Sequence, residues 1–277
     1  MLAKQTTEYM EQMNKNIDDK LRIMDWITGD RVLDAGCGGG EFLLRLHQSG
    51  YDAYGLDFSL LSFKELHKKG LNRWFIHGDI LNMKTYLEGM KIDTIVFSSV
   101  LHEVYSYNGF DIKKVTETLK NAYDALPVGG RIVIRDGIKM KNGHKKVLIR
   151  FKDVNDVLFL TEYCKRFEGR KVTFEPVDKL TYKMELNDAM EFLYTYTWGW
   201  ESFDREVQEQ FGIATPDDYE LMVKSNLPKA KVLHKESYLQ HGYVDHLTNK
   251  AWVLHEDKSL AKYPDSTFLM VIEKGEE

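Results

Sequence analysis

Short apolar runs alternate with helix-like segments through the first half of the chain, and this rhythm constrains the fold more than any other feature. Strands that alternate with helices indicate βαβ units, because neighbouring parallel strands need a crossover connection, usually a helix. The sequence therefore predicts an α/β fold with a doubly wound, mostly parallel sheet. The five runs lie at Arg31–Ala35, Asp52–Leu56, Arg73–Ile76, Asp93–Ser98 and Arg131–Arg135.

Turn and capping residues mark the ends of the intervening helices. Gly50 stands where a C′ glycine would end the helix after the first run. Asp111 is expected to cap a helix that ends at Ala125, before Pro127. One apolar stripe predicts a further helix at the start of the chain, through Tyr9, Met13, Ile17, Leu21 and Met24.

The strand–helix rhythm stops after Asp136. We expect residues 1–138 and 229–277 to form the core, and residues 139–228 to form a mainly helical insertion before the last two strands. Because the insertion follows a strand, we expect it to cap the site beside the carboxyl ends of the sheet, where ligands bind in such folds. Its helices are expected at Val154–Phe167, Ser202–Phe211 and Pro216–Ser225, and the last strands at Lys231–Tyr238 and Thr267–Lys274.

Composition restricts the class of protein. Hydrophobic residues make up 43% of the 277 residues, enough for a substantial core, and the formal charge of −5 gives no overall attraction for polyanions. The two cysteines, Cys37 and Cys164, form no paired motif, so we expect neither a disulfide framework nor a metal site. Without a leader-like or membrane-spanning apolar segment, a cytoplasmic location is expected; the oligomeric state stays open.

The segment from Val32 to Glu41 predicts a strand, a glycine-dense turn and a helix. Glycines allow positive φ angles and let the backbone approach a ligand closely. A dinucleotide fingerprint, G-x-G-x-x-G, that starts at Gly36 requires a glycine at position 41, but Glu41 stands there. The sequence therefore argues against a site for a pyrophosphate.

Asp34 followed by Gly36-x-Gly38-x-Gly40 resembles motif I of the class I S-adenosylmethionine-dependent methyltransferases. Asp57 stands 21 residues after Gly36, where an acid can accept hydrogen bonds from ribose hydroxyls. The resemblance covers residues 20–137 well, the last two strands weakly and the insertion not at all. It implies S-adenosyl-L-methionine as cofactor and these binding residues: Asp34, Gly36, Cys37, Gly38, Gly40, Asp57, Phe58, Gly78, Asp79, Ile80 and Ser98.

Methyl transfer from a sulfonium is an in-line displacement, so the enzyme mainly aligns the nucleophile and excludes water. A general base is needed only for a protonated nucleophile. His102 and Glu103 are the candidate catalytic residues, because they follow the fourth strand, where ligands gather in open α/β sheets. The alternative for His102 is a structural role in the following helix.

Aromatic residues alternate with smaller ones from Phe192 to Trp200. On a strand they would share one face and could form the wall of the acceptor pocket, with Tyr194, Tyr196 and Trp198 as candidate substrate-binding residues. Core filling is the commoner use of such a stripe, and a helix would disperse the face.

Residues 139–152 carry six Lys or Arg and no acid. This run suits a phosphorylated or nucleic-acid acceptor, although a solvated loop and helix face is its more usual meaning. A methyltransferase acting on a small molecule is therefore the leading hypothesis. An RNA or nucleotide methyltransferase and a non-catalytic S-adenosylmethionine-binding protein are the alternatives.

Overall fold

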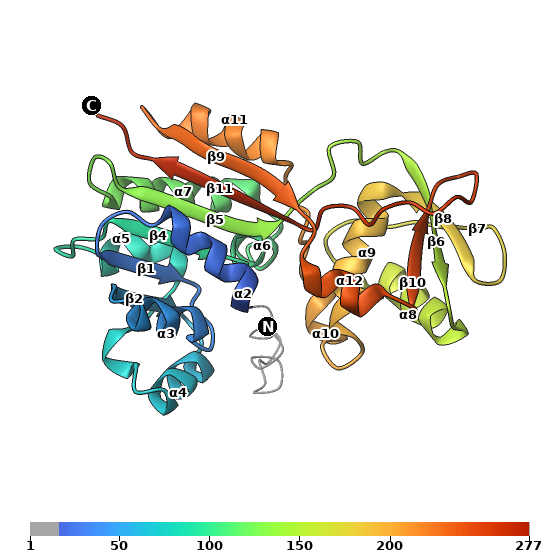
Figure 1. Ribbon diagram of the computed structural model, residues 1–277, viewed down its shortest axis with the longest axis horizontal. Coiled ribbons are helices and arrows are strands. Elements are labelled where there is room, and N and C mark those ends of the chain that lie inside the picture. Colours follow the sequence, from blue (N-terminus) through green and yellow to red (C-terminus); the bar gives the residue numbers. More distant parts are fainter. Residues whose placement is uncertain (1–16, 277) are drawn as a thin grey trace.

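Seven strands form the larger sheet of the computed structural model, which describes residues 17–276 (Figure 1). The strand order is β3-β2-β1-β4-β5-β11-β9; the first five strands are parallel, and β11 runs antiparallel to both β5 and β9. The predicted α/β fold with a mostly parallel sheet is confirmed. The strands are β1 Arg31–Ala35, β2 Asp52–Asp57, β3 Phe75–His77, β4 Thr94–Ser98, β5 Arg131–Gly137, β9 Lys231–Tyr238 and β11 Thr267–Glu273.

Helices cover both faces of this sheet. Successive residues of a strand point to opposite faces, so Val32 and Leu33 of β1 belong to two different hydrophobic clusters. The Val32 cluster contains buried residues of α3 Glu41–Gln48 and α4 Leu60–Lys68. The Leu33 cluster contains those of α5 Met83–Tyr86, α6 Leu101–Ser106, α7 Ile112–Ala125 and α11 Pro216–Asn226.

Several predicted boundaries are confirmed. Gly50 follows the C-cap of α3 with a φ of 91°, and the Asp111 side chain caps α7 by accepting a hydrogen bond of 2.9 Å from Lys113 N. The third strand begins later than predicted, because Arg73 belongs to the short helix η2 Asn72–Trp74. Short helix η3 spans Ile80–Asn82. No helix of residues 17–276 is long and apolar enough to cross a membrane.

Within the described residues, the α-helix at the start of the chain is shorter than predicted. Tyr9 and Met13 lie outside the described residues. The chain forms α2 Ile17–Lys20 and then a 3-10 helix, η1 Leu21–Trp26, which buries Ile23 against the sheet. Because a 3-10 helix winds more tightly than an α-helix, the buried residue is Ile23 and not Leu21 or Met24 of the predicted apolar stripe.

A second, antiparallel sheet lies beside the first, in the order β10-β6-β8-β7 (Figure 1). Helices dominate residues 139–228, as predicted, but this insertion also contains strands, and residues 241–254 add α12 and β10 to the same region. The prediction missed these parts because they are short and pair only in the tertiary structure. The elements are β6 Lys146–Phe151, α8 Val154–Arg166, β7 Glu175–Pro176, β8 Thr181–Glu185, α9 Leu186–Trp198, α10 Phe203–Glu206, α12 His241–Leu247 and β10 Ala251–Leu254.

The aromatic stripe lies on helix α9, which is the second of the two possibilities that the sequence left open. A helix places residues four apart on one face. Phe192 and Tyr196 therefore pack together, with ring centroids 5.3 Å apart, inside the aromatic core of the second sheet's helices. Tyr194 and Trp198 turn to another side. The helix predicted at Ser202–Phe211 was too long, since only Phe203–Glu206 is helical.

Candidate functional site

Two cavities open at the carboxyl ends of β1 to β5, and both are lined by Ser99 and Glu103. The cofactor-side cavity, of about 490 Å³, lies against the loops that follow β1, β2, β3 and β4. The cap-side cavity, of about 680 Å³, lies between the ends of β4 and β5 and the elements α9 and α12. β1 and β4 are neighbours at the point where the strand order reverses, which is where open α/β sheets bind ligands.

The glycine loop leaves no side chain at the closest approach to the cofactor-side cavity. Gly36 has a φ of 81°, and a Cβ there would lie 2.5 Å from Val100 Cγ2. Gly38, with a φ of 50°, donates its N–H to Asp57 Oδ2 at 2.9 Å. The loop therefore keeps a conformation that only glycine adopts easily, and it is tied to the end of β2.

Seven of the predicted cofactor residues line this cavity. Asp57 is 8% exposed, and burial raises the pKa of its carboxyl although the amides of Ser59 and Gly38 oppose the shift. Asp79 accepts a hydrogen bond of 2.9 Å from Leu81 N, which fixes its position at the start of η3. The seven are Gly36, Gly38, Asp57, Phe58, Gly78, Asp79 and Ile80.

Four predicted cofactor residues do not line the cavity. Asp34 is 3% exposed; burial raises the pKa of its carboxyl to about 7, and the nearby charge of Lys20 partly offsets this. Cys37 packs on Gly55 in the core, and Gly40 caps α3. The Ser98 hydroxyl is buried without a hydrogen bond. The motif therefore contains residues that shape the loop as well as residues that face the cavity.

The cofactor-side cavity fits the group that the sequence predicts. Its volume lies within the range of about 300–1,000 Å³ typical of small-molecule sites. A side chain at Gly36 would collide with Val100, which lines the same cavity, so this wall of the cavity depends on glycine. The carboxylates of Asp57 and Asp79 supply acceptors for hydroxyl and amino groups of a nucleoside.

Arg135 organises the wall between the two cavities. Its side chain is 2% exposed; Nε donates to Asp19 Oδ2 at 2.7 Å and Nη1 donates to Ser99 Oγ at 2.9 Å. Ser99 has a φ of 57°, an uncommon conformation for a residue other than glycine. Such strain persists only where the surroundings fix it, and here it turns Ser99 toward both cavities.

Aromatic side chains line the cap-side cavity, among them two of the three predicted substrate-binding residues. The Tyr194 hydroxyl accepts from Ile138 N at 3.0 Å and donates to Ser266 O at 2.8 Å. Trp198 lies one helical turn further along α9. Tyr196 does not line the cavity, because its hydroxyl bonds Asp156 on the opposite side of the helix.

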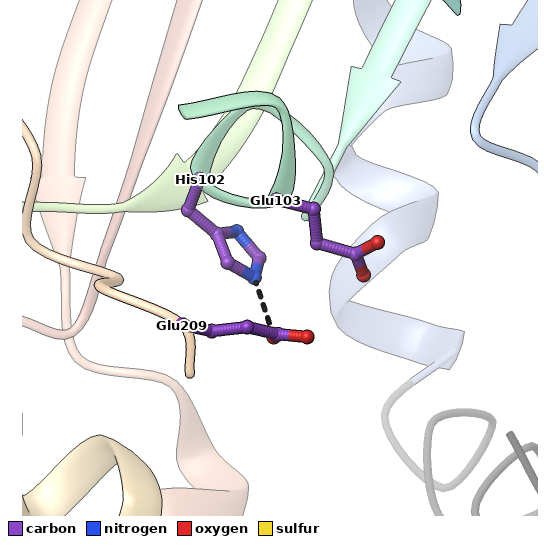
Figure 2. A group of neighbouring side chains, drawn as sticks. All are labelled: His102, Glu103 and Glu209. Atoms are coloured by element: carbon purple, nitrogen blue, oxygen red, sulfur yellow. Dashed lines mark ion pairs between the residues drawn. The ribbon is translucent and has the colours of Figure 1, made fainter. Parts of the chain in front are cut away.

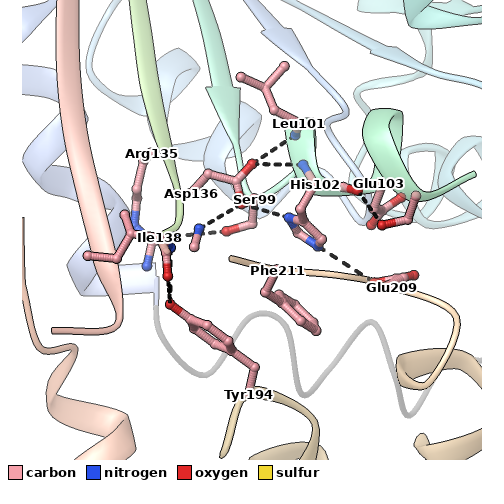
Figure 3. Close-up of polar contacts among 12 residues, drawn as sticks. Ser99, Leu101, His102, Glu103, Arg135, Asp136, Ile138, Tyr194, Glu209 and Phe211 are labelled. Carbon is pink, nitrogen blue, oxygen red and sulfur yellow. Dashed lines mark hydrogen bonds and ion pairs between the residues drawn. The ribbon is translucent and has the colours of Figure 1, made fainter. Parts of the chain in front are cut away.

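His102 is held in place by Asp136, which the sequence analysis did not single out (Figure 3). Nδ1 of the imidazole lies 2.6 Å from Asp136 Oδ1, while Asp136 Oδ2 accepts from Leu101 N at 2.8 Å. Phe211 stacks on the ring at a centroid distance of 4.5 Å. Burial alone would lower the pKa of His102, but Asp136 and Glu209 outweigh it and hold that pKa well above its ordinary value.

Glu103 belongs to a charged cluster that also includes Arg205, Glu206 and Glu209. Arg205 Nη2 lies 3.0 Å from Glu103 Oε1 and 3.0 Å from Glu209 Oε1. Burial and the charge of Glu209 raise the pKa of Glu103 to about 7, although Arg205 opposes the shift. Sequence reasoning missed the last three residues; the only signal was an acid four residues after an arginine, which is commonplace on exposed helices.

Residues 28–190, more than half of the chain, match the family described as "Methyltransferase domain". Three similar solved structures share the fold. The plantazolicin methyltransferase BamL, in complex with a triazolic desmethylPZN analogue and SAH, has 15% identity and a TM-score of 0.54, over 97% of this chain and 89% of that one. A second structure comes from a study entitled "Conversion of a Disulfide Bond into a Thioacetal Group during Echinomycin Biosynthesis". It has 17% identity and a TM-score of 0.50, over 93% of this chain and 81% of that one.

The [4+2]-cyclase SpnF has 12% identity and a TM-score of 0.50, over 94% of this chain and 80% of that one. No curated protein sequence matches the chain. At such identities the structural likenesses establish the fold alone, and a shared fold does not fix an activity. The family match carries the assignment: the chain belongs to the methyltransferase-domain family, as a class I S-adenosylmethionine-dependent methyltransferase.

Proposed function

We propose that the chain transfers a methyl group to a small-molecule acceptor bound in the cap-side cavity. One observation carries this proposal: the two cavities share Ser99 and Glu103, so ligands in the two cavities would meet at these residues. In-line displacement needs the nucleophile and the methyl carbon in contact and water excluded. Two cavities that adjoin at Ser99 and Glu103 would allow the two ligands to come into contact there.

On this proposal the cofactor-side cavity holds S-adenosylmethionine, which supplies a methyl group on a sulfonium when bound. Asp57 accepts hydrogen bonds from the ribose hydroxyls, and Asp79 lies toward the adenine amino group beside Ile80. The glycine loop leaves room for the amino-acid end. Asp34 is buried in β1, the strand that leads into this loop, and the charge of Lys20 acts on it.

The cap-side cavity favours a small, partly aromatic or apolar acceptor. Tyr194, Trp198, Phe211 and Tyr243 supply apolar wall, while Glu103 can accept a hydrogen bond from a hydroxyl or amino group of the acceptor. We propose that the second sheet and its helices act as a cap that keeps water out. The cap then comprises the elements from β6 to α10 together with residues 241–254, which supply α12 and β10. Helix α11 also falls within the expected range 139–228, but it packs on the larger sheet and is not part of this cap (Figure 1).

The basic run supports a small-molecule acceptor better than a nucleic acid. Its second half forms β6, between β8 and β10, so its lysines do not gather at the cavities. Lys141 pairs with Asp217 at 2.8 Å, and Lys146 pairs with Glu185 at 3.6 Å. Acids therefore neutralise part of the charge that a polyanion would need.

Incubation with cofactor carrying a labelled methyl group tests the proposal. Two pools are offered in parallel, a low-molecular-weight metabolite extract and total RNA. We expect label in the small molecules only, and we expect Glu103→Gln to reduce it. Label in the RNA would favour the nucleic-acid alternative. Cofactor binding without label in either pool would favour a binding protein.

A further inference from the structure

A buried carboxylate oxygen at the junction of the two cavities has no hydrogen-bond donor. Glu209 is 1% exposed; its Oε1 accepts from Tyr107 and Arg205, but its Oε2 makes no hydrogen bond. Oε2 lies 3.6 Å from His102 Nε2, beyond hydrogen-bond distance (Figure 2). Buried carboxylate oxygens normally have partners, so this one indicates a ligand.

The neighbouring side chains have the spacing of metal ligands. One ligand atom from each of His102, Glu103 and Glu209 lies within 4.8 Å of the other two. Ligands on one cation lie roughly 3–3.5 Å apart when bond lengths are about 2.1 Å. The distance of 3.6 Å between His102 Nε2 and Glu209 Oε2 is close to this, so the group needs only a small closing movement.

Asp136 gives His102 the orientation of a metal-binding histidine. Ligating histidines almost always place their second ring nitrogen against a carboxylate or carbonyl, which fixes the ring and aims the other nitrogen at the metal. His102 Nδ1 lies 2.6 Å from Asp136 Oδ1, and Nε2 is thereby turned toward Glu209.

The local charge also favours a cation. Asp136, Glu103, Glu206 and Glu209 are four carboxyl groups, and Arg205 is the guanidinium that pairs with them. Glu206 is fully buried, and neither of its oxygens makes a hydrogen bond. The four carboxyl groups outnumber the two basic side chains, Arg205 and His102. A divalent cation that takes the place of the proton on His102 Nε2 would leave less uncompensated charge in this buried region.

We propose that His102, Glu103 and Glu209 form a binding site for a divalent transition-metal cation. One imidazole and two carboxylates, without a thiolate, suit Mn²⁺ or Zn²⁺ better than a soft cation. No metal-binding motif is visible in the sequence, because Glu209 is distant from the His102–Glu103 pair along the chain. His102 and Glu103 also line the cap-side cavity, so the cation would face the acceptor. There the cation would polarise an acceptor hydroxyl. This catalytic role rests on the proposed function, whereas the binding of the cation does not.

Electron paramagnetic resonance of Mn²⁺ tests this site directly. Chelator-treated, full-length protein is titrated with MnCl₂, and free Mn²⁺ is counted from its signal; ZnCl₂ and MgCl₂ serve as competitors. We expect one Mn²⁺ per chain, displaced by Zn²⁺ more readily than by Mg²⁺. Glu209→Gln should weaken binding at least about tenfold, and Asp136→Asn about 10–100-fold.

Glu220→Gln is the matched control, because Glu220 pairs with Lys235 on the outside of the larger sheet. Its Mn²⁺ affinity should equal that of the unaltered protein. Circular dichroism checks that each variant folds. Should Glu209→Gln not fold, Glu103→Gln, at a more exposed position, provides the same comparison. Absence of binding at millimolar Mn²⁺, or unchanged affinity in the folded variants, would overturn the site. Cofactor binding measured in chelator stands independently of either result.

Discussion

Asp57 accepts a hydrogen bond of 2.9 Å from the amide of Gly38, so the end of β2 is joined to the glycine loop that follows β1. This contact holds the carboxylate against the cofactor-side cavity while the other oxygen accepts from Ser59 N at 2.8 Å. The loop and the carboxylate are therefore one unit, and altering either should alter cofactor binding.

Replacing Asp57 should weaken the binding of S-adenosylmethionine. Hydrogen bonds to charged groups contribute about 1.5–3 kcal/mol, so Asp57→Ala is expected to raise the dissociation constant roughly 10- to 100-fold in calorimetry. Asp52→Ala is the control, since Asp52 starts the same strand on the exposed side. Equal affinities in the two variants would contradict the assignment.

Gly36→Ala should destabilise the protein and reduce cofactor affinity. The new Cβ would lie 2.5 Å from Val100 Cγ2, at a φ of 81°. Gly129→Ala is the control that measures backbone strain without a steric collision, because Gly129 has a φ of 78° and nothing lies within 4 Å of its added Cβ. Urea unfolding should show a loss of about 1–3 kcal/mol at Gly129 and a larger loss at Gly36. Equal losses would exclude the collision.

Asp34 should make stability depend on pH. Its carboxyl has a pKa of about 7 in the fold against an ordinary 3.8, so the stability present at low pH is lost as pH rises through about 7. Below about pH 7, Lys20 adds little, because its pKa of about 8 leaves it mostly charged in both states. Relative to the unaltered protein, Asp34→Asn should gain roughly 2–4 kcal/mol between pH 4 and pH 7 in denaturant titrations. If the stability of the two proteins changed equally with pH, the pKa of the Asp34 carboxyl would not be raised in the fold.

Trp198→Ala should raise the KM for the acceptor without changing cofactor affinity. Trp198 lines the cap-side cavity but not the cofactor-side cavity, and loss of an aromatic contact should raise KM by about tenfold. Trp200→Ala is the control, because Trp200 is 53% exposed and lines neither cavity. The measurement uses the acceptor that labelling identifies. A similar rise in both variants would place the acceptor elsewhere.

The sequence predicted the larger sheet mainly because its five parallel strands and β11 contain short apolar runs with a turn or helix on either side, whereas β9 is mostly polar. Asp57 and Asp79 were found for the same reason, since Asp57 ends β2 and Asp79 comes two residues after β3. The second sheet was missed because the apolar residues of β6 stand within a lysine-rich run and β10 comes from a distant segment.

The charged cluster could not be predicted from the sequence. Arg205, Glu206 and Glu209 resemble the charged face of an exposed helix, and nothing local indicates that Glu206 and Glu209 are fully buried. Only the tertiary structure brings them against His102 and Glu103. The aromatic residues of α9 are a different case. Their alternation left both a strand and a helix possible, and the helix places only Tyr194 and Trp198 of the candidate residues at the cap-side cavity.

A crystal structure with S-adenosylhomocysteine tests most directly whether methyl transfer occurs where the two cavities meet. We predict the nucleoside against Asp57 and Asp79, with the sulfur directed toward Ser99 and Glu103. Density for the ligand in the cap-side cavity, or a sulfur atom directed away from Glu103, would contradict the account.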